Sequence, residues 1–386
     1  MTERSVRHMR HERGAALKET GGRMDMRVLV LLILLLMCGL VSLFSASYYT
    51  FQDSGDAYAK VRQQLAGIAL GTAALTACSR IPYRFYRRPW VILSLLAGSA
   101  ALLALVLIPG IGVLANGSRR WLNLAGMSFQ PSEFAKFAMI VYMANALCNK
   151  GERVRRFFTG LLPVLLVPGV MFLMILEQPN LSTAGSILIV AFVMVAVAGA
   201  RVHHLGVLGL GGMALGLYYA WSEPYRRERL LSFRDPFAQM SDEGYQLSQS
   251  LIAFGSGGLF GMGLGQGRQK TAYLPYPESD FIFASIAEDF GLVGCLCVVA
   301  LFLAFVYAGL RVALRCPDRF GSLLAAGITA MIGVQAFLNM GVVVGILPTT
   351  GLPLPFFSAG GTSVAIFMAA VGVLLNISRE DEWRVR

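Results

Sequence analysis

Charged residues are scarce in this sequence. Asp, Glu, Lys and Arg make up only 14% of its 386 residues, while hydrophobic residues make up 56%. An average soluble domain carries about 25% charged residues. The apolar residues are gathered into blocks of about 17–25 residues, the length that crosses the core of a bilayer. The composition therefore argues against a soluble fold and indicates a protein that crosses a membrane several times.

The familiar motifs of several enzyme classes are also absent. The sequence contains no Gly-x-x-x-x-Gly-Lys-Ser/Thr phosphate loop and no His-Glu-x-x-His, and none of its four histidines suits a serine triad. These absences argue against ATP-driven transport and zinc hydrolysis. The six cysteines lie in or beside apolar blocks without the usual zinc spacing, so we interpret them as inert buried thiols.

The apolar blocks predict an all-α, polytopic membrane protein of about ten transmembrane helices. We expect tails at residues 1–26 and 379–386 and one transmembrane domain at 27–378, with an uncleaved first span because the N-terminal tail is long and polar. The block 281–311 is too long for a simple span, and its apolar core begins near Phe290. We therefore expect Asp280 to Asp289 to form a polar turn or a tilted entrance at one surface. The expected helices are 27–48, 64–80, 90–109, 132–148, 158–177, 182–200, 203–221, 281–311, 322–346 and 360–377.

The positions of Lys and Arg predict the orientation of these helices in the membrane. Of 33 such residues, 22 lie in the two tails and in alternate connecting segments, as an even number of spans with both termini in the cytoplasm requires. Residues 222–280 then form one long extracytoplasmic loop. This distribution accounts for the net charge of +11, and we expect no nucleic-acid partner.

Arg119 and Arg120 run against this distribution, because they lie in a short segment on the predicted outer face. They indicate a site on that face that needs positive charge, although binding to lipid headgroups would also account for them. The same segment leads to Glu133 and Lys136, three residues apart on a predicted helix and close enough to pair. Charged residues at the mouth of a membrane helix usually face a polar cavity. The pair is therefore either a simple ion pair at the rim or part of a site.

Asp280 lies where the long outer loop meets the next predicted helix. Its residue type suits a helix N-cap. It also suits a general base, because partial burial beside apolar groups raises the pKa of a carboxylate toward the useful range. Composition leaves both roles open.

Residues 347–363 contain three prolines and three glycines between two apolar blocks, which predicts irregular, re-entrant backbone. Such backbone is tolerated at membrane depth only where protein or a water-filled cavity satisfies it. Ser358, with Gly360 and Gly361 before a helix, could offer N–H groups to an anion. A rigid outer loop is the alternative.

Five long motifs, in order, resemble the FtsW/RodA/SpoVE family, which is known for its part in cell shape, elongation, division and sporulation. The resemblance runs from about residue 28 to 378. The motif sequences are more similar to those of the division and sporulation branches of the family. QPNLSTA (178–184) departs from the commoner QPDLGTA, which leaves the branch open. The motifs are GSRRWLNLAGMSFQPSEFAK (117–136), PYRRERLLSFRDP (224–236), YQLSQSLIAFGSGGLFGMGLGQGRQK (245–270), ESDFIFASIAEDFG (278–291) and LPTTGLPLPFFSAGGTS (347–363).

The resemblance implies a multi-pass protein of the cytoplasmic membrane that polymerises lipid II into glycan strands of peptidoglycan, as an inverting glycosyltransferase. It implies a class B penicillin-binding transpeptidase as a partner, besides other membrane proteins of division or sporulation. Asp280 matches the proposed catalytic aspartate. No cofactor is specified, although a divalent cation, Mg²⁺ or Mn²⁺, could share the pyrophosphate charge. The residues assigned to the substrate and its pyrophosphate are Arg119, Arg120, Glu133, Lys136, Gln249 and Ser358.

A flippase that carries lipid II across the membrane is the alternative function, and a non-catalytic scaffold is a third. A flippase would need a matching site on the inner face and charge deep within the spans. Glu177 is the main candidate for such charge and lies near the end of its predicted helix. The sparse intramembrane charge therefore favours the enzyme.

Overall fold

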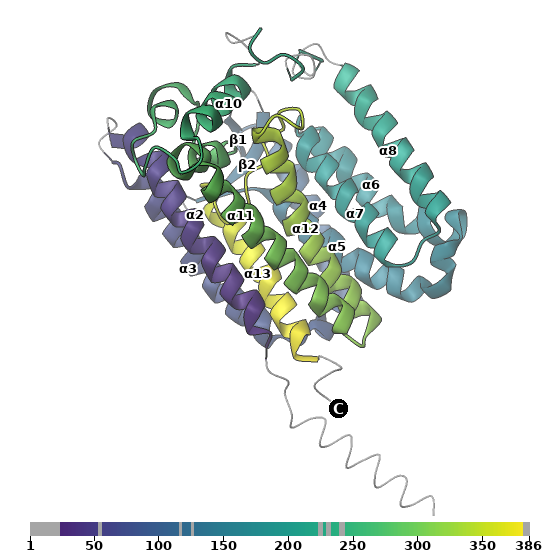
Figure 1. Ribbon diagram of the computed structural model, residues 1–386. Helices are drawn as coiled ribbons and strands as arrows, with labels where there is room; N and C mark the ends of the chain where they lie inside the picture. Colours follow the sequence, from purple (N-terminus) through teal and green to yellow (C-terminus); the bar gives the residue numbers. More distant parts are fainter. Residues whose placement is uncertain are drawn as a thin grey trace, which may run out of the picture.

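The computed structural model describes residues 24–52, 56–115, 118–124, 127–222, 227–228, 233–238 and 244–380. Of the predicted tails, residues 1–23 and 381–386 lie outside these ranges. The described chain is mainly helical, as expected, and its long helices form one bundle (Figure 1). They match the predicted blocks one by one: α2 (Met26–Gln52), α3 (Ala59–Arg80), α4 (Pro89–Leu107), α5 (Pro131–Lys150), α6 (Leu162–Leu176), α7 (Leu181–Val197), α8 (Val202–Ser222), α11 (Ile282–Arg315), α12 (Arg319–Val343) and α13 (Gly361–Ile377).

Several of these helices can cross a bilayer by length and apolar composition alone. Among the described residues there are six such segments, which confirms the prediction of a membrane protein. Helix α7 is apolar but has only 17 residues. The number of ten spans therefore stays a prediction. The six segments are Met26–Tyr48, Pro89–Leu107, Phe157–Leu176, Ile282–Arg315, Arg319–Val343 and Gly361–Glu380.

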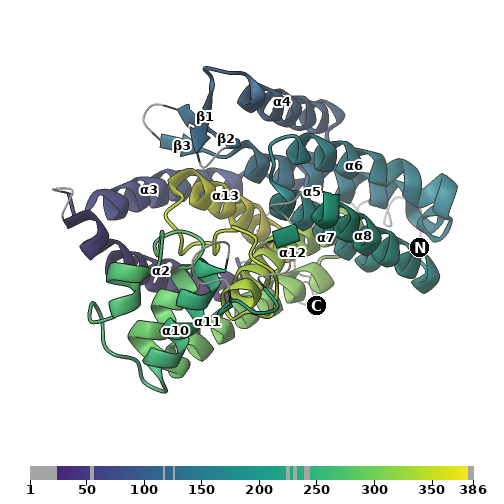
Figure 2. The ribbon, with the colours of Figure 1, turned by 90° about the horizontal axis from the view of Figure 1, so that it is seen from above.

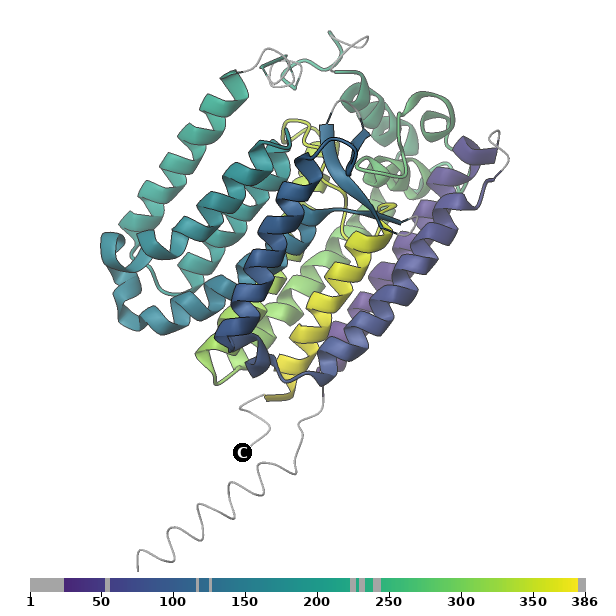
Figure 3. The ribbon, with the colours of Figure 1, turned by 180° about the vertical axis from the view of Figure 1, so that it is seen from behind.

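Helix α3 is less apolar than its neighbours because small residues face the centre of the bundle. A Cβ atom on Gly67 would overlap the backbone of Gly361, and one on Gly71 would overlap the side chain of Met368. Helices α3 and α13 therefore approach closely along their length, as Figure 3 shows. Small residues at such a contact let two membrane helices pack backbone to backbone.

The two ends of the bundle differ in structure. At one end, which we call the termini end, the backbone N–H of Asp25 donates to the hydroxyl of Ser378 (2.9 Å), and Tyr83 Oη donates to Glu380 (2.6 Å). The opposite end, which we call the loop end, carries the helix α10 (Tyr245–Gly257), the π-helical turn η4 (Gln269–Tyr273) and the loop 344–360 (Figure 1).

A small antiparallel sheet also lies at the loop end. Its strands β1 (Gly112–Ala115), β2 (Ser118–Leu124) and β3 (Met127–Phe129) follow one another in space (Figure 3). The all-α expectation missed it. The segment between α4 and α5 is short and lies beyond the helix ends, where consecutive chain reversals pair their own backbone groups as a β-meander.

Helix α11 is broken near its start. Gly291 has φ 66° and ψ −162°, which no helical residue adopts. The free carbonyls of Glu288 and Asp289 accept from the N–H groups of Met262 and Gly263 (2.9 and 3.1 Å). Beyond the break, the N–H groups of residues 292 and 293 donate to the carbonyls of residues 258 and 259. A loop segment thus fills the break and leaves residues 282–290 as a separate first half-helix. Where the sequence predicted a polar turn or tilted entrance, the structure has a helical segment that is mostly apolar and buried.

Candidate functional site

Asp280 lies at the loop end, immediately before α11, and its side chain is half-buried. The N-cap position of α11 is Phe281, so Asp280 lies one residue before the cap position. Its Oδ2 atom lies 3.6 Å from the position that a Cβ atom on Gly351 would occupy. Gly351 has φ 69° and belongs to the loop between α12 and α13. The carboxylate therefore faces bare backbone of that loop.

The loop 344–360 is tied to the residues on the chain just before Asp280. Ser358 Oγ donates to the carbonyl of Ser279 (2.6 Å) and accepts from the N–H of Leu354 (2.9 Å). The N–H of Ala359 donates to the carbonyl of Glu278 (3.0 Å). The Ser358 hydroxyl is engaged both as donor and as acceptor, so in this structure it braces the loop against the Asp280 turn.

Glu133 and Lys136 form the predicted pair. Lys136 Nζ lies 2.8 Å from Glu133 Oε1, and the side chains are 1% and 0% exposed. Lys136 also donates to Gln335 Oε1 of α12 and lies 5.7 Å from the ring centroid of Phe367. The pair is thus inside the bundle rather than at its rim. Taking both charges out of water is costly unless each is paired and hydrogen-bonded, so this pair depends on its neighbours on α12 and α13.

Gln335 and Asn339 of α12 connect the Glu133–Lys136 pair to Asp280. Gln335 Nε2 donates to the carbonyl of Pro353 (3.0 Å). Asn339 Nδ2 donates to the carbonyls of Asp280 (2.6 Å) and Leu352 (2.7 Å). Sequence reasoning missed both amides. The signal was available, because two amides four residues apart on an otherwise apolar helix lie on one face of it.

The two arginines lie on β2, where consecutive side chains point to opposite faces of the strand. Arg120 Nε donates to the carbonyl of Gln178 (3.2 Å), and its Nη2 to that of Pro179, so this side chain joins the sheet to the turn between α6 and α7. In the same turn Asn180 caps α7 by accepting from the N–H of Thr183. Arg119 is half-buried on the other face of the strand.

Gln249 lies on α10 and is 7% exposed. Its neighbour Ser250 donates from Oγ to the carbonyl of Val343 (2.7 Å), which fastens α10 to the last turn of α12. From above, α10 lies beside the start of α11 (Figure 2). Gln249 is therefore at the same end of the bundle as Asp280.

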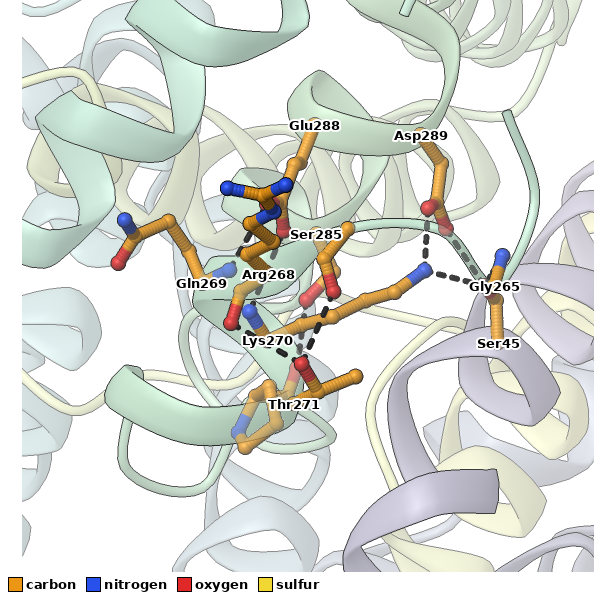
Figure 4. Close-up of polar contacts among 11 residues, drawn as sticks. Ser45, Gly265, Arg268, Gln269, Lys270, Thr271, Ser285, Glu288 and Asp289 are labelled. Atoms are coloured by element: carbon orange, nitrogen blue, oxygen red, sulfur yellow. Dashed lines mark hydrogen bonds and ion pairs between the residues drawn. The ribbon is translucent and has the colours of Figure 1, made fainter. Parts of the chain in front are cut away.

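A second buried cluster anchors the far end of the first half-helix of α11 (Figure 4). Lys270 Nζ pairs with Asp289 and donates to Ser45 Oγ (2.7 Å), and Ser45 Oγ in turn donates to Asp289 Oδ2 (2.6 Å). The Glu288 carboxylate accepts from the N–H groups of Gln269 (2.8 Å) and Lys270 (3.2 Å). The half-helix that begins beside Asp280 is thereby held at both of its ends.

Buried charge in the described chain gathers at the loop end. The buried ionisable side chains other than cysteine and tyrosine are Glu133, Lys136, Lys270, Glu278, Glu288 and Asp289. In the described ranges, no three His, Cys, Asp or Glu side chains come together as metal ligands.

Helices that span a membrane, with a braced carboxylate and buried charge at the loop end, define an integral membrane protein with a polar site at one end of its bundle. This chain belongs to the FtsW/RodA/SpoVE family: the sequence model of that family, described as "Cell cycle protein", matches residues 26–382. This confirms the resemblance seen in the motifs. The protein is accordingly one of the cytoplasmic membrane.

Two similar proteins agree with this assignment to the family. The chain is 42% identical over 363 residues to "Stage V sporulation protein E" of Bacillus subtilis, covering 93% of this chain and 98% of the relative. It is 41% identical over 357 residues to "Probable peptidoglycan glycosyltransferase FtsW" of Geobacter sulfurreducens, covering 92% and 95%.

Solved structures with the same fold include the rod shape determining protein RodA of Thermus thermophilus. It has a TM-score of 0.69 and 28% identity and covers 93% of this chain and 98% of its own. A second structure, described as "Structural coordination of polymerization and crosslinking by a peptidoglycan synthase complex", has a TM-score of 0.77 and 29% identity, with 92% and 98% coverage.

Proposed function

We propose that this protein is a peptidoglycan glycosyltransferase that polymerises lipid II on the outer face of the cytoplasmic membrane, during division or sporulation. The names of its relatives support the activity. The single observation that carries the proposal is the setting of Asp280, a half-buried residue held at the loop end of the bundle between the broken helix α11 and the loop 344–360.

In the proposed reaction, the 4-hydroxyl of a GlcNAc in one lipid-linked disaccharide attacks the anomeric carbon of the MurNAc that ends a growing chain. A C–O bond forms, the bond from that carbon to the pyrophosphate oxygen breaks with inversion, and undecaprenyl pyrophosphate leaves. Asp280 takes the proton of the attacking hydroxyl, a step that typically contributes about 10²–10⁴ in rate. Its place beside Gly351 supports this role, because that residue has no side chain to cover the carboxylate.

The pyrophosphate gains charge as it leaves, and fixed cations lower the energy of that state. We assign this role to Arg119 and Arg120 on β2, with Lys136 acting from inside the bundle. Glu133, Gln249 and Ser358 remain assigned to the substrate, with Ser358 acting through the loop that it braces. No step here passes through Mg²⁺ or Mn²⁺, since no group of three or more His, Cys, Asp or Glu side chains in the described ranges marks a site for either.

The proposed topology has ten spans, both termini in the cytoplasm and residues 222–280 outside. The short distance between Asp25 and Ser378 supports it, because both ends of the domain 27–378 then lie on one side. The loop end is the outer face in this arrangement. The tails 1–26 and 379–386 are assigned to the cytoplasm.

The proposed partner is a class B penicillin-binding transpeptidase, with other division or sporulation membrane proteins around it. The likeness to a structure from a peptidoglycan synthase complex that couples polymerization and crosslinking supports a partner of this kind.

A flippase is less well supported. Alternating access needs binding groups that can face either side, whereas the buried carboxylates and lysines of the described chain all lie at the loop end. Glu177, the charge considered for such a pathway, is exposed at the end of α6.

Product analysis with labelled lipid II and purified protein tests the proposal. We expect long glycan strands, released as a ladder after hydrolysis of the lipid. Translocation of lipid II in vesicles without strands would instead establish a flippase. If folded protein with its transpeptidase present neither forms glycan strands nor translocates lipid II, a non-catalytic scaffold is the remaining function.

A further inference from the structure

Asn339 is the side chain that holds the backbone of Asp280. It is 1% exposed, and its one NH₂ group donates both of its hydrogens to backbone carbonyls: one to Asp280 at 2.6 Å and one to Leu352 at 2.7 Å. Leu352 directly follows Gly351, the residue that the Asp280 carboxylate faces. A single amide group therefore sets the spacing between the carboxylate and the loop that lies opposite it.

Helix α12 is a rigid support that can fix the distance between Asp280 and the loop 344–360. It runs unbroken from Arg319 to Val343, and most of its span is buried in the bundle. Asp280 and Leu352, in contrast, lie in backbone without regular helix or strand. Neither segment can fix its own position through a hydrogen-bond ladder, so both depend on side chains from a rigid neighbour. One turn earlier, Gln335 binds the next carbonyl of the same loop, Pro353 (3.0 Å).

We propose that Asn339 is a positioning residue for Asp280. It keeps the carboxylate where it can reach the attacking hydroxyl and does so through the backbone. This inference rests on the proposed function, since it takes Asp280 as the general base. A base must lie within about 2.6–3.2 Å of the group whose proton it takes, and a displacement of about 1 Å can lower a rate on the order of 10²-fold.

The chain offers a matched control in Asn376 of α13. Its Oδ1 accepts from the N–H of Tyr83 (2.8 Å) and its Nδ2 donates to the carbonyl of Ser79 (2.8 Å), so it too joins two backbone segments from a buried helix. It does this at the termini end, far from Asp280 along the bundle. Asn339→Ala and Asn376→Ala each remove two hydrogen bonds between a buried amide side chain and the backbone, although Asn339 donates both and Asn376 donates only one.

The first measurement is steady-state polymerisation of lipid II at a temperature where both variants are folded. We expect both substitutions to lower the melting temperature by similar amounts. Only Asn339→Ala should lower kcat, on the order of 10²-fold, with KM for lipid II within about twofold because the cations on β2 are untouched. Asn339→Ser, which keeps one donor, should fall between the wild type and Asn339→Ala. It supplies the measurement if the alanine variant does not fold.

The second measurement needs no activity. Deuterium uptake by the peptide covering residues 278–284 should be faster in Asn339→Ala than in the wild type and unchanged in Asn376→Ala. If the wild type makes no glycan strands, the proposed function falls, while the exchange data still test the positioning. The inference is overturned if Asn339→Ala keeps kcat within about twofold of the wild type, if Asn376→Ala lowers kcat equally, if only KM rises, or if exchange at 278–284 does not change.

Discussion

Ser358 Oγ donates a 2.6 Å hydrogen bond to the carbonyl of Ser279, the residue that precedes Asp280. This bond joins the loop between α12 and α13 to the entrance of α11, although 79 positions separate the two residues in the sequence. The same two segments meet again where Ala359 binds Glu278 and where Asp280 faces Gly351. The site is therefore a contact between two irregular segments, each held by helices that are themselves well packed.

Asp280→Asn should abolish polymerisation while leaving the fold intact. The amide has the shape of the carboxylate but cannot take a proton, so we expect a loss of about 10²–10⁴ in rate. Strand formation from labelled lipid II measures it, with copurification of the transpeptidase as a check on the fold. Asp318→Asn, at the N-cap of α12 and the termini end, is the control, because Asn caps a helix as well as Asp does. Normal strands from Asp280→Asn would remove this residue from the mechanism.

Arg119→Ala should weaken use of the lipid-linked donor more than it lowers expression. Its side chain is half-buried on one face of β2, whereas Arg120 on the other face binds the carbonyls of Gln178 and Pro179. We expect KM for lipid II to rise in Arg119→Ala, and expression to fall more in Arg120→Ala. Membrane yield and initial rates across lipid II concentrations separate the two effects. A collapse of expression in Arg119→Ala with normal KM would mean that this arginine is structural.

Lys136→Met should strongly destabilise the bundle. It leaves the Glu133 carboxylate buried, 0% exposed and without its cation, which typically costs about 3–5 kcal/mol. Thermal unfolding in detergent measures the loss. The double variant Glu133→Gln with Lys136→Met removes both charges and should recover most of the stability. If that double variant folds yet forms strands at least about tenfold more slowly, the cation contributes to the reaction; a normal rate would restrict the pair to structure.

Gly67→Ala should disrupt the contact between α3 and α13, because its Cβ atom would overlap the backbone of Gly361, which cannot move as a flexible side chain can. Overpacking of this kind typically costs about 1–3 kcal/mol. Gly98→Ala on α4 is the control: nothing lies within 4 Å of its Cβ position, so we expect no loss of stability. Equal melting temperatures for the two variants would argue against close packing of α3 on α13.

Much of the fold was predictable because the bilayer restricts it. Long apolar blocks must be helices in lipid, where every backbone group needs a partner within the segment. The blocks therefore located α2 to α8 and α11 to α13 to within a few residues. The break in α11 at Gly291 was not predicted, because the sequence indicated only a polar turn or tilted entrance before residue 290. The sheet between α4 and α5 was missed, because three short strands outside the lipid leave no periodic signal.

The candidate site was predictable only in part. Its charged members, such as Asp280 and Lys136, stand out against an apolar background, and the family motifs include them. Asn339 and Gln335 are two amides on one face of an apolar helix, but the sequence does not say what they bind, nor does it show that Ser45 lies beside Lys270 and Asp289. Their importance comes from partners that lie far away in sequence, and hydrogen bonds of that kind cannot be deduced from local spacing.

The sequence by itself determined that this protein lies in a membrane, where its long helices lie to within a few residues, and which family it belongs to. These properties depend on residues that are consecutive in the chain. A long block of apolar residues is enough to place a helix in the membrane. Only the tertiary structure decided that the Glu133–Lys136 pair is inside the bundle, and that an amide on α12 holds the backbone of Asp280 against the loop 344–360. Those properties depend on directional contacts of about 3 Å between distant segments, and packing of the whole bundle is what brings the partners within that distance.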